Sequence, residues 1–416
     1  MLLEIRSMKF LNLHNYQDRN YRYVVLTCVL SFVLIGDILN PLLNFIAINL
    51  PTKNNNFYDY ATLATIIPSL PFLFSFLISY LVNNYPYRKI IHLNYILLLS
   101  ITLALLIMNV NDITLIAIFI ALSGIIFRAI YFSLDKQLTT ILAAKAWDFM
   151  ADITIFGALI GSINIKFAGY IYSHYQTRGI LLVFAIGLLL LWWCAAQIPA
   201  IKNLESKSAL PSLRLSNLLI TIWKLPAFTR YLAIMAIYLA LSSPFYLLLT
   251  TKVHQESIGI ERYTSLMAAA MFCSIAGAMC CKLKFITQRP AHKIIGLSIL
   301  ANSLCWINLS YTTTFMSFSL CYILSSIISI VTLVHMNTLI LQHINSQPEL
   351  VKISPLVSGA IASLFYLSNL LGPLLCNLLF KAHLNYLQIY VAGGIIQIAI
   401  AGVVFQLKNQ PLKINP

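Results

Sequence analysis

The sequence predicts an all-α polytopic membrane protein, with twelve transmembrane helices in two pseudo-symmetric bundles of six. Hydrophobic residues make up 60% of the 416 residues and charged residues only 9%, whereas an ordinary soluble domain carries about 25% charged residues. Apolar segments recur with short polar breaks, and most are long enough to cross a hydrocarbon core about 30 Å thick. The longest break, about residues 199–227, separates six segments from six.

The first apolar segment, residues 24–47, contains one carboxylate, Asp37, near its middle. Asp37, Asn40 and Asn44 are spaced i, i+3 and i+7, so a helix places all three on one face. An ionisable group at this depth is costly and usually faces a bundle interior or a water-filled path. We therefore expect Asp37 to bind a proton, another cation or a substrate. A carboxylate satisfied by neighbouring hydroxyls and amides is the alternative.

The other segments follow in order along the chain. We expect helices near residues 60–82, 90–109, 113–133, 149–172, 179–198, 228–250, 263–281, 293–310, 314–341, 353–379 and 385–406. Proline removes a helix hydrogen bond and bends a helix. Four prolines are therefore expected to kink their helices: Pro41, Pro68, Pro71 and Pro244.

Lysine and arginine are distributed unevenly between alternate breaks. With a cytoplasmic N-terminus, twenty lie inside, two lie within spans and five lie outside, which accounts for all 27. The five outside residues are Lys53, Arg178, Lys252, Arg262 and Lys381. Basic residues concentrate on the cytoplasmic side, so we expect both termini there and a multi-pass protein of a bacterial inner (plasma) membrane. The net charge of +15 then requires no nucleic-acid partner.

The chain is expected to divide into five parts. These are a cytoplasmic N-terminal segment (1–23), an N-terminal six-helix bundle (24–198), a cytoplasmic linker (199–227), a C-terminal six-helix bundle (228–406) and a cytoplasmic tail (407–416). Within the linker, residues 212–225 form an amphipathic pattern that is typical of a helix lying on the membrane surface. A regulatory docking site is the alternative for this stretch.

Two short matches suggest that the halves are duplicated. Residues 40–43 (NPLL) are echoed by 243–246 (SPFY), and residues 60–63 (YATL) by 263–266 (YTSL). Both pairs are offset by 203 positions. Repeats of this kind place a binding site near the bilayer midplane, between the two halves.

Three further charges lie within predicted spans. Arg128 and Asp152 lie at similar depth on either side of a short cytoplasmic loop, and an ion pair would lower the cost of burying them. Such a pair could close an inner gate, bind an anionic substrate, or only hold two helices together. Lys166 lies toward the outer end of its span, where a long side chain can reach the interface.

Softer candidates lie in the C-terminal half. His335, Thr338 and Gln342 share one face of the tenth helix, where a histidine could change charge near neutral pH or simply be hydrogen-bonded. Asn369 in the eleventh helix is a further polar candidate. The eight cysteines all fall in apolar runs and are expected to be reduced apolar fillers. The chain has no P-loop, HExxH or Gly-x-Ser-x-Gly motif, so we expect no enzyme activity, no cofactor and no metal site.

Twelve helices in a 6+6 arrangement, with a basic central loop and both ends inside, resemble the major facilitator superfamily. The loop after the second helix of that family runs Gly-x-Leu-x-Asp-Arg-x-Gly-Arg-Lys. Residues 79–89 here keep the Leu and the basic end, Arg88-Lys89, but Asn83 and Asn84 replace the Asp and Arg. The resemblance implies a gating loop containing Asn83, Arg88 and Lys89, with the family's charge contacts altered.

Other stretches resemble the exporter-rich branches of that superfamily, which hold lysophospholipid, siderophore and drug transporters. They are Gly36-Asp37, residues 150–155 (MADITI) leading to Gly161-Ser162, residues 337–342 (NTLILQ) and residues 371–374 (LGPL). This resemblance implies a secondary active transporter working by alternating access, an efflux antiporter coupled to protons. The substrate would be a small organic molecule, amphipathic by this resemblance, and the protein a monomer in the lipid bilayer. Proton-coupled import of a small metabolite and a non-transporting sensor or scaffold are the alternatives.

Overall fold

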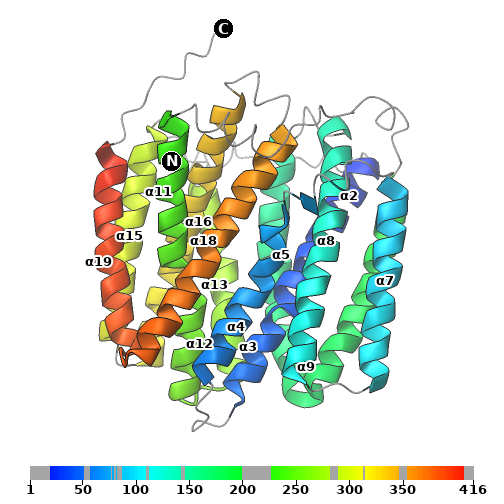
Figure 1. Ribbon diagram of the computed structural model, residues 1–416, viewed down its shortest axis with the longest axis horizontal. Coiled ribbons are helices and arrows are strands. Elements are labelled where there is room, and N and C mark those ends of the chain that lie inside the picture. Colours follow the sequence, from blue (N-terminus) through cyan, green and yellow to red (C-terminus); the bar gives the residue numbers. More distant parts are fainter. Residues whose placement is uncertain are drawn as a thin grey trace, which may run out of the picture.

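The structure is a computed structural model that describes residues 19–50, 57–75, 77–78, 81, 87–108, 112–141, 146–198, 226–281, 289–312, 314–345 and 354–406. These residues are helical apart from short turns, and no strand occurs among them. The helices run side by side along one direction (Figure 1). Ten described helices are long and apolar enough to cross a membrane. The prediction of an all-α polytopic membrane protein is therefore confirmed.

The N-terminal half contains interrupted and continuous helices. The first predicted span is divided into α2 (Arg19–Phe32), the π-helix η2 (Val33–Leu39) and α3 (Pro41–Ile48). The second is divided into α4 (Phe57–Ile66), the 3-10 helix η3 (Ile67–Ser69) and α5 (Leu70–Leu73). The remaining helices are α7 (Tyr87–Met108), α8 (Ile113–Ile141) and α9 (Ala146–Ala196).

Helix α9 contains both the fifth and the sixth predicted spans. At a rise of about 1.5 Å per residue, 51 helical residues would extend about 76 Å, more than twice the thickness of a hydrocarbon core. Gln176 breaks the helix with φ 55° and ψ −154°, at the place where the sequence predicts a turn. The ten spans count α9 once and leave out the interrupted α4–α5 segment. Twelve separate spans therefore stay a prediction.

The C-terminal half comprises α11 (Pro226–Ser242), α12 (Phe245–Gln255), α13 (Ile260–Cys280), α15 (Ala291–Tyr311), α16 (Phe315–Asn345), α18 (Ser354–Lys381) and α19 (Tyr386–Gln406). The placement of Lys252 in an outside loop was wrong. Lys252 lies within α12 and is buried, because its ammonium group pairs with Glu256 one turn later at 2.5 Å. Pairing with Glu256 offsets part of the cost of burying the lysine charge.

The predicted proline kinks are visible in three helices. Asn40 separates the π-helix η2 from Pro41, Pro68 lies within η3, and Ser243-Pro244 separates α11 from α12. The matched stretches 40–43 and 243–246 thus interrupt the first helix of each half at corresponding places. Kinks of this kind leave backbone groups free near the middle of a span, where binding sites are common.

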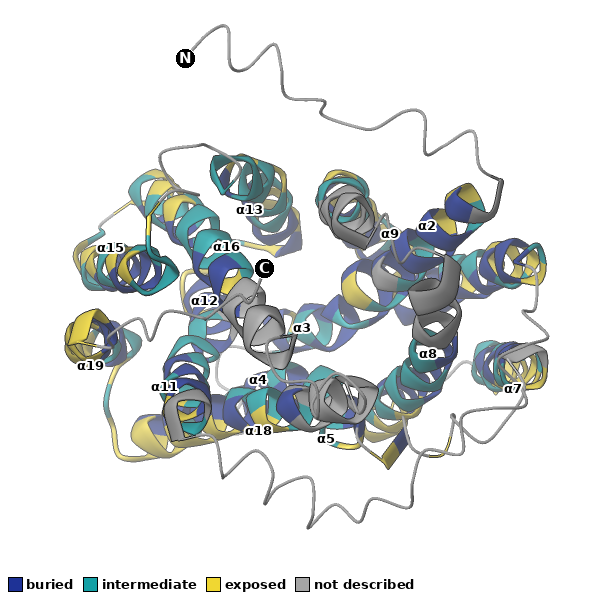
Figure 2. Cartoon of the chain, turned by 90° about the horizontal axis from the view of Figure 1, so that it is seen from above, coloured by how far each residue is buried: buried dark blue, intermediate teal, exposed yellow. Residues whose placement is uncertain are grey.

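The two halves meet along three sets of helices. Helix α9 packs against α13, α18 packs against α4 and α5, and α12 packs against α3 and α4. Figure 2 shows the helices from above, with α3 and α4 near the centre and α12 on the side of α11 and α16. The start of α2 and the end of α19 lie at the same end of the bundle (Figure 1). The linker 199–225, the tail 407–416 and residues 1–18 lie outside the described residues.

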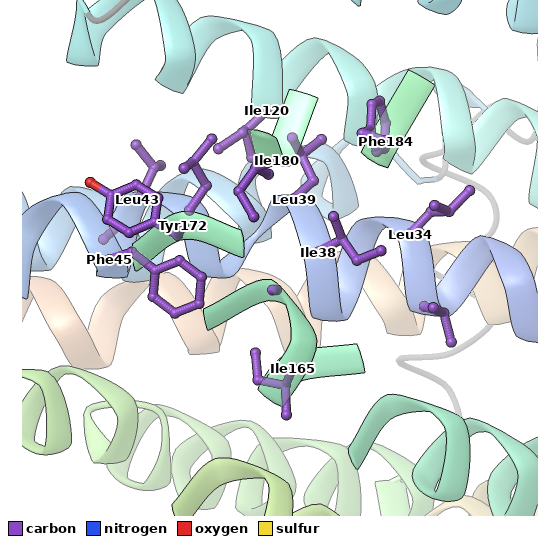
Figure 3. Packing of buried hydrophobic residues seen from close by; sticks show 14 of the residues in the cluster. Leu34, Ile38, Leu39, Leu43, Phe45, Ile120, Ile165, Tyr172, Ile180 and Phe184 are labelled. Atoms are coloured by element: carbon purple, nitrogen blue, oxygen red, sulfur yellow. The ribbon is translucent and has the colours of Figure 1, made fainter. Parts of the chain in front are cut away.

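Apolar packing fixes the first span within the N-terminal half. Leu34, Ile38 and Leu39 of η2 lie beside side chains of α8 and α9, including Ile120 and Phe184 (Figure 3). Within a bilayer this packing acts through van der Waals contacts, because lipid tails are as apolar as leucine. Large apolar side chains such as Ile107 face outward and are exposed, which suits contact with lipid. All eight cysteines are free, as predicted.

A buried polar network lies inside the C-terminal half. The Asn302 side chain accepts a hydrogen bond from Ser325 Oγ at 2.6 Å, and its amide nitrogen lies 3.4 Å from both Tyr238 Oη and Gln397 Oε1. These four residues come from α15, α16, α11 and α19, and all are buried. The network ties four helices of one half into a single unit.

Replacing Asn302 with Leu is expected to destabilise this half. Ser325 and Gln397 would lose partners in an apolar interior, at a cost of about 1–2 kcal/mol. Thermal unfolding of the purified protein in detergent would show a lower midpoint temperature, with Gln406→Leu at the exposed end of α19 as the control. An unchanged midpoint for Asn302→Leu would mean that the network contributes nothing to stability.

Candidate functional site

Asp37 lies in the π-helix η2, near the middle of the first span. The wider turn is visible at Asn40, whose N–H donates to the Ile35 carbonyl oxygen five residues earlier, at 2.8 Å. π-Helical turns are rare, and they occur frequently at functional sites. Asp37 is buried, with 8% of its surface exposed. The sequence prediction of a carboxylate inside the bundle therefore agrees with its place in the structure.

The carboxylate of Asp37 lies where the two halves meet. A β-carbon added to Gly161 of α9 would stand 2.7 Å from Asp37 Oδ2 and 2.5 Å from the Met271 methyl group of α13. Asp37 therefore lies against a helix of its own half and is close to a methionine of the other. Among the described residues, Asp37 has no hydrogen bond or ion pair. A buried carboxylate in this setting is costly when ionised, so it is a suitable group to take up a proton or a cation.

The α9–α13 contact around Asp37 is unusually close. Two turns beyond Gly161, a β-carbon on Gly169 would stand 2.5 Å from the Thr264 methyl group of α13. Small residues at such spacing let two membrane helices approach closely. Lys166, between these two glycines, donates to Ser265 Oγ and to the Glu261 carbonyl oxygen at 3.3 Å. The lysine predicted to reach the interface thus also connects the two halves.

A second polar residue of the first span, Asn44, also contacts the C-terminal half. Asn44 of α3 accepts a hydrogen bond from Thr250 Oγ1 of α12 at 3.3 Å. Asn40 stands half-buried between η2 and α3. The predicted polar face of Asp37, Asn40 and Asn44 thus has two of its members at contacts between the halves.

Arg128 is half-buried in α8 among aromatic rings. Its guanidinium carbon lies 5.5 Å from the ring centre of Tyr131 and 5.9 Å from that of Phe132, both on α8. The Tyr366 ring of α18, in the other half, lies at 5.6 Å. These are cation–π distances, and they place a positive charge at a second contact between the halves. The side chain of Asp152 lies outside the described residues, so the Arg128–Asp152 ion pair stays a prediction.

The remaining candidates do not gather around Asp37. His335 is buried in α16, where its Nδ1 lies 2.9 Å from the Val331 carbonyl oxygen and 3.8 Å from Cys281 Sγ, all within the C-terminal half. Asn369 is half-buried in α18, and Lys89 is exposed at the start of α7. The side chains of Thr338, Gln342 and Arg88, and the whole of Asn83, lie outside the described residues.

Contacts at the end of the bundle opposite the start of α2 were missed by the sequence analysis. Asp59 of α4 pairs with Lys381 at 2.8 Å and accepts a hydrogen bond from Asn377 Nδ2 at 2.9 Å. These two donors hold the pKa of the Asp59 carboxyl below its ordinary value. His254 of α12 is also buried against the N-terminal half. Each of these residues stands at the end of an apolar run, and no local pattern reveals its partner.

No protein-family model and no curated protein matches the chain. Solved structures do match over most of its length. The nucleoside transporter NupG aligns with 94% of this chain and 99% of its own, with a TM-score of 0.67 and 12% identity. The human organic anion transporter MFSD10 (TETRAN) aligns with 94% and 98%, with a TM-score of 0.63 and 15% identity.

Two helical halves that meet around a buried carboxylate define a polytopic membrane protein of the two-bundle type. The similarities to NupG and MFSD10 show that it shares the fold of these two membrane transporters. At 12–15% identity they show the fold alone.

Proposed function

We propose that the protein is a secondary active transporter of a small organic molecule, working by alternating access and coupled to protons. The observation that carries the proposal is Asp37, a buried carboxylate between the two halves that has no hydrogen bond or ion pair with any described residue. The fold supports it, because NupG and MFSD10, which share this fold, are membrane transporters. The role is transport, with no enzyme activity and no cofactor besides the coupling proton.

Proton coupling follows from what lies close to Asp37. Met271 belongs to the C-terminal half, so movement of the halves changes how much water reaches the carboxylate. A neutral carboxylic acid is tolerated in the closed interior, and an ionised one is tolerated when water enters. Proton binding and the position of the halves thus influence one another by linkage. If a proton and a substrate bind the same site alternately, movement of the proton across the membrane is coupled to movement of the substrate in the opposite direction.

The substrate class is proposed from chemistry and resemblance together. Arg128, with Tyr131 on its own helix and Tyr366 from the other half, suits a molecule carrying an anionic group and a flat apolar part. The exporter-like stretches favour outward movement of an amphipathic molecule. We place the protein as a monomer in a bacterial inner membrane, with both termini cytoplasmic. Import of a small metabolite is the alternative direction.

Proton release from the purified protein tests this function. Members of a ligand panel are added in weakly buffered detergent solution: nucleosides, organic anions, lysophospholipids and hydrophobic cations. We expect at least one class to release protons as it binds, because substrate and proton would exclude each other at Asp37. The same class should leave preloaded vesicles as protons enter. Entry together with protons would reverse the direction, and no proton movement with any class would contradict coupled transport.

A further inference from the structure

Three consecutive residues at the outer end of α4 each contact the C-terminal half. Phe57 stacks on His254, Tyr58 stacks on Phe380 and accepts a hydrogen bond from Gln255, and Asp59 binds Asn377 and Lys381. We call this set the outer seal. Its members are Phe57, Tyr58, Asp59, His254, Gln255, Asn377, Phe380 and Lys381. In Figure 1 the start of α4 and the ends of α12 and α18 lie at the end of the bundle opposite the start of α2.

His254 is at the centre of this seal. Its ring lies parallel to that of Phe57, with ring centres 3.8 Å apart and planes 9° apart. Its Nδ1 lies 3.2 Å from the carbonyl oxygen of Ile48, the last residue of α3. One turn earlier on both helices, Thr250 donates to Asn44. The imidazole therefore joins α12 to both α3 and α4.

The contact with the Ile48 carbonyl oxygen indicates which ring nitrogen of His254 carries the hydrogen. A carbonyl oxygen only accepts, so Nδ1 carries the hydrogen and Nε2 is the bare nitrogen of a neutral ring. Nε2 is buried and has no hydrogen-bond partner among the described residues, and only 5% of the residue is exposed. A second proton on this ring would create a buried charged N–H without an acceptor, which is strongly unfavourable.

The carboxylates near His254 already have hydrogen-bond or ion-pair partners. On α4, Asp59 is held by Lys381 and Asn377 of α18, which keep its pKa below the ordinary value. On α12 itself, Glu256 is bound by Lys252 at 2.5 Å. The Tyr386 hydroxyl of α19 lies 3.4 Å from the same carboxylate. On α3, the contact is the neutral Ile48 carbonyl. None of these groups accepts a hydrogen bond from Nε2.

We propose that His254 is a proton-binding site that opens the outer seal. A proton arriving from the outer side forms an N–H bond at Nε2, and the resulting imidazolium is stable only when α12 moves away from α3 and α4 and water reaches it. The inference deepens the proposed function and rests on it for the side from which the proton comes. Outer acidity would thus favour the conformation that is open to the outside, at a site separate from Asp37.

Hydrogen exchange of the intact protein in detergent tests this proposal without measuring transport. After correction for the intrinsic pH dependence of exchange, we expect protection of the α12 amides to fall about fivefold as the pH is lowered from about 6.5 to 5.5. His254→Gln, which cannot take up a proton, should remove this dependence. Asp59 does not account for a response in this range, because its carboxyl titrates at lower pH.

His174→Gln is the matched control. His174 is an exposed histidine of α9 whose Nδ1 contacts only the Tyr170 carbonyl of its own helix at 2.9 Å, so the variant should keep the full response. A wild-type protein without pH-dependent protection would overturn the proposal even if His254→Gln fails to fold. So would a His254→Gln variant that keeps the response. Asp37→Asn should also keep it, so loss of coupled transport and loss of the seal response are distinguishable.

Discussion

Replacing Asp37 with Asn is expected to abolish proton-driven transport while leaving the fold intact. The amide has nearly the same shape as the carboxyl group but cannot release a proton. Asp37 has no hydrogen bond or ion pair among the described residues, so the substitution breaks none there. We expect the free energy of unfolding to change by less than about 1 kcal/mol. Transport driven by a pH gradient in vesicles should fall to the level of empty vesicles.

Exchange of substrate across the membrane separates coupling from binding. If Asp37 carries only the proton, exchange without a gradient should persist in Asp37→Asn. Asp112→Asn is the control, because Asp112 is an exposed carboxylate whose side chain caps the start of α8 at 2.7 Å from the Thr114 nitrogen, and Asn caps helices equally well. Undiminished gradient-driven transport by Asp37→Asn would contradict the assignment of Asp37 as the proton site.

The depth and burial of Asp37 could be predicted from the sequence, because an apolar run of 24 residues places its centre near the bilayer midplane whatever its neighbours are. The π-helix η2 could not be predicted from the sequence. A π-turn inserts one extra residue, and whether η2 forms depends on how Leu34, Ile38 and Leu39 pack against α8 and α9. The prediction from the i, i+3, i+7 spacing was made for a regular α-helix. It could not give the angular position of Asn40 relative to Asp37 across the π-turn.

The contacts of Lys166 and His254 were also beyond the sequence analysis. The partners of both residues come from the other half of the protein, and hydropathy shows only that a charged or polar residue stands near the end of a span. The signal lies in pairing: residues 44 and 250, and residues 48 and 254, form two contacts with a common separation of 206. Such a ladder can be recognised only once α3 and α12 are known to lie side by side.

A methyl group at position 161 is expected to impair transport. Replacing Gly161 with Ala would place a carbon 2.7 Å from Asp37 Oδ2 and 2.5 Å from the Met271 methyl group, so α9 and α13 could not approach as they do here. Overpacking of this kind costs about 1–3 kcal/mol. This cost destabilises only the conformation in which α9 and α13 are in close contact at Gly161. The substitution therefore shifts the equilibrium toward conformations in which the two helices are further apart. We expect the initial rate of transport in vesicles to fall about tenfold or more.

Gly157 provides the matched control one turn earlier on α9. A β-carbon there would meet nothing within 4 Å, and replacing a helical Gly with Ala normally stabilises a helix by about 1 kcal/mol. Gly157→Ala should therefore be as active as the wild type and slightly more stable, whereas Gly161→Ala should be less stable despite the same gain in helix propensity. Adding Met271→Ala removes one of the two obstructing groups, so the double variant should recover part of the lost rate. Equal behaviour of the two alanine variants would mean that the close approach of α9 and α13 at Asp37 has no part in the transport cycle.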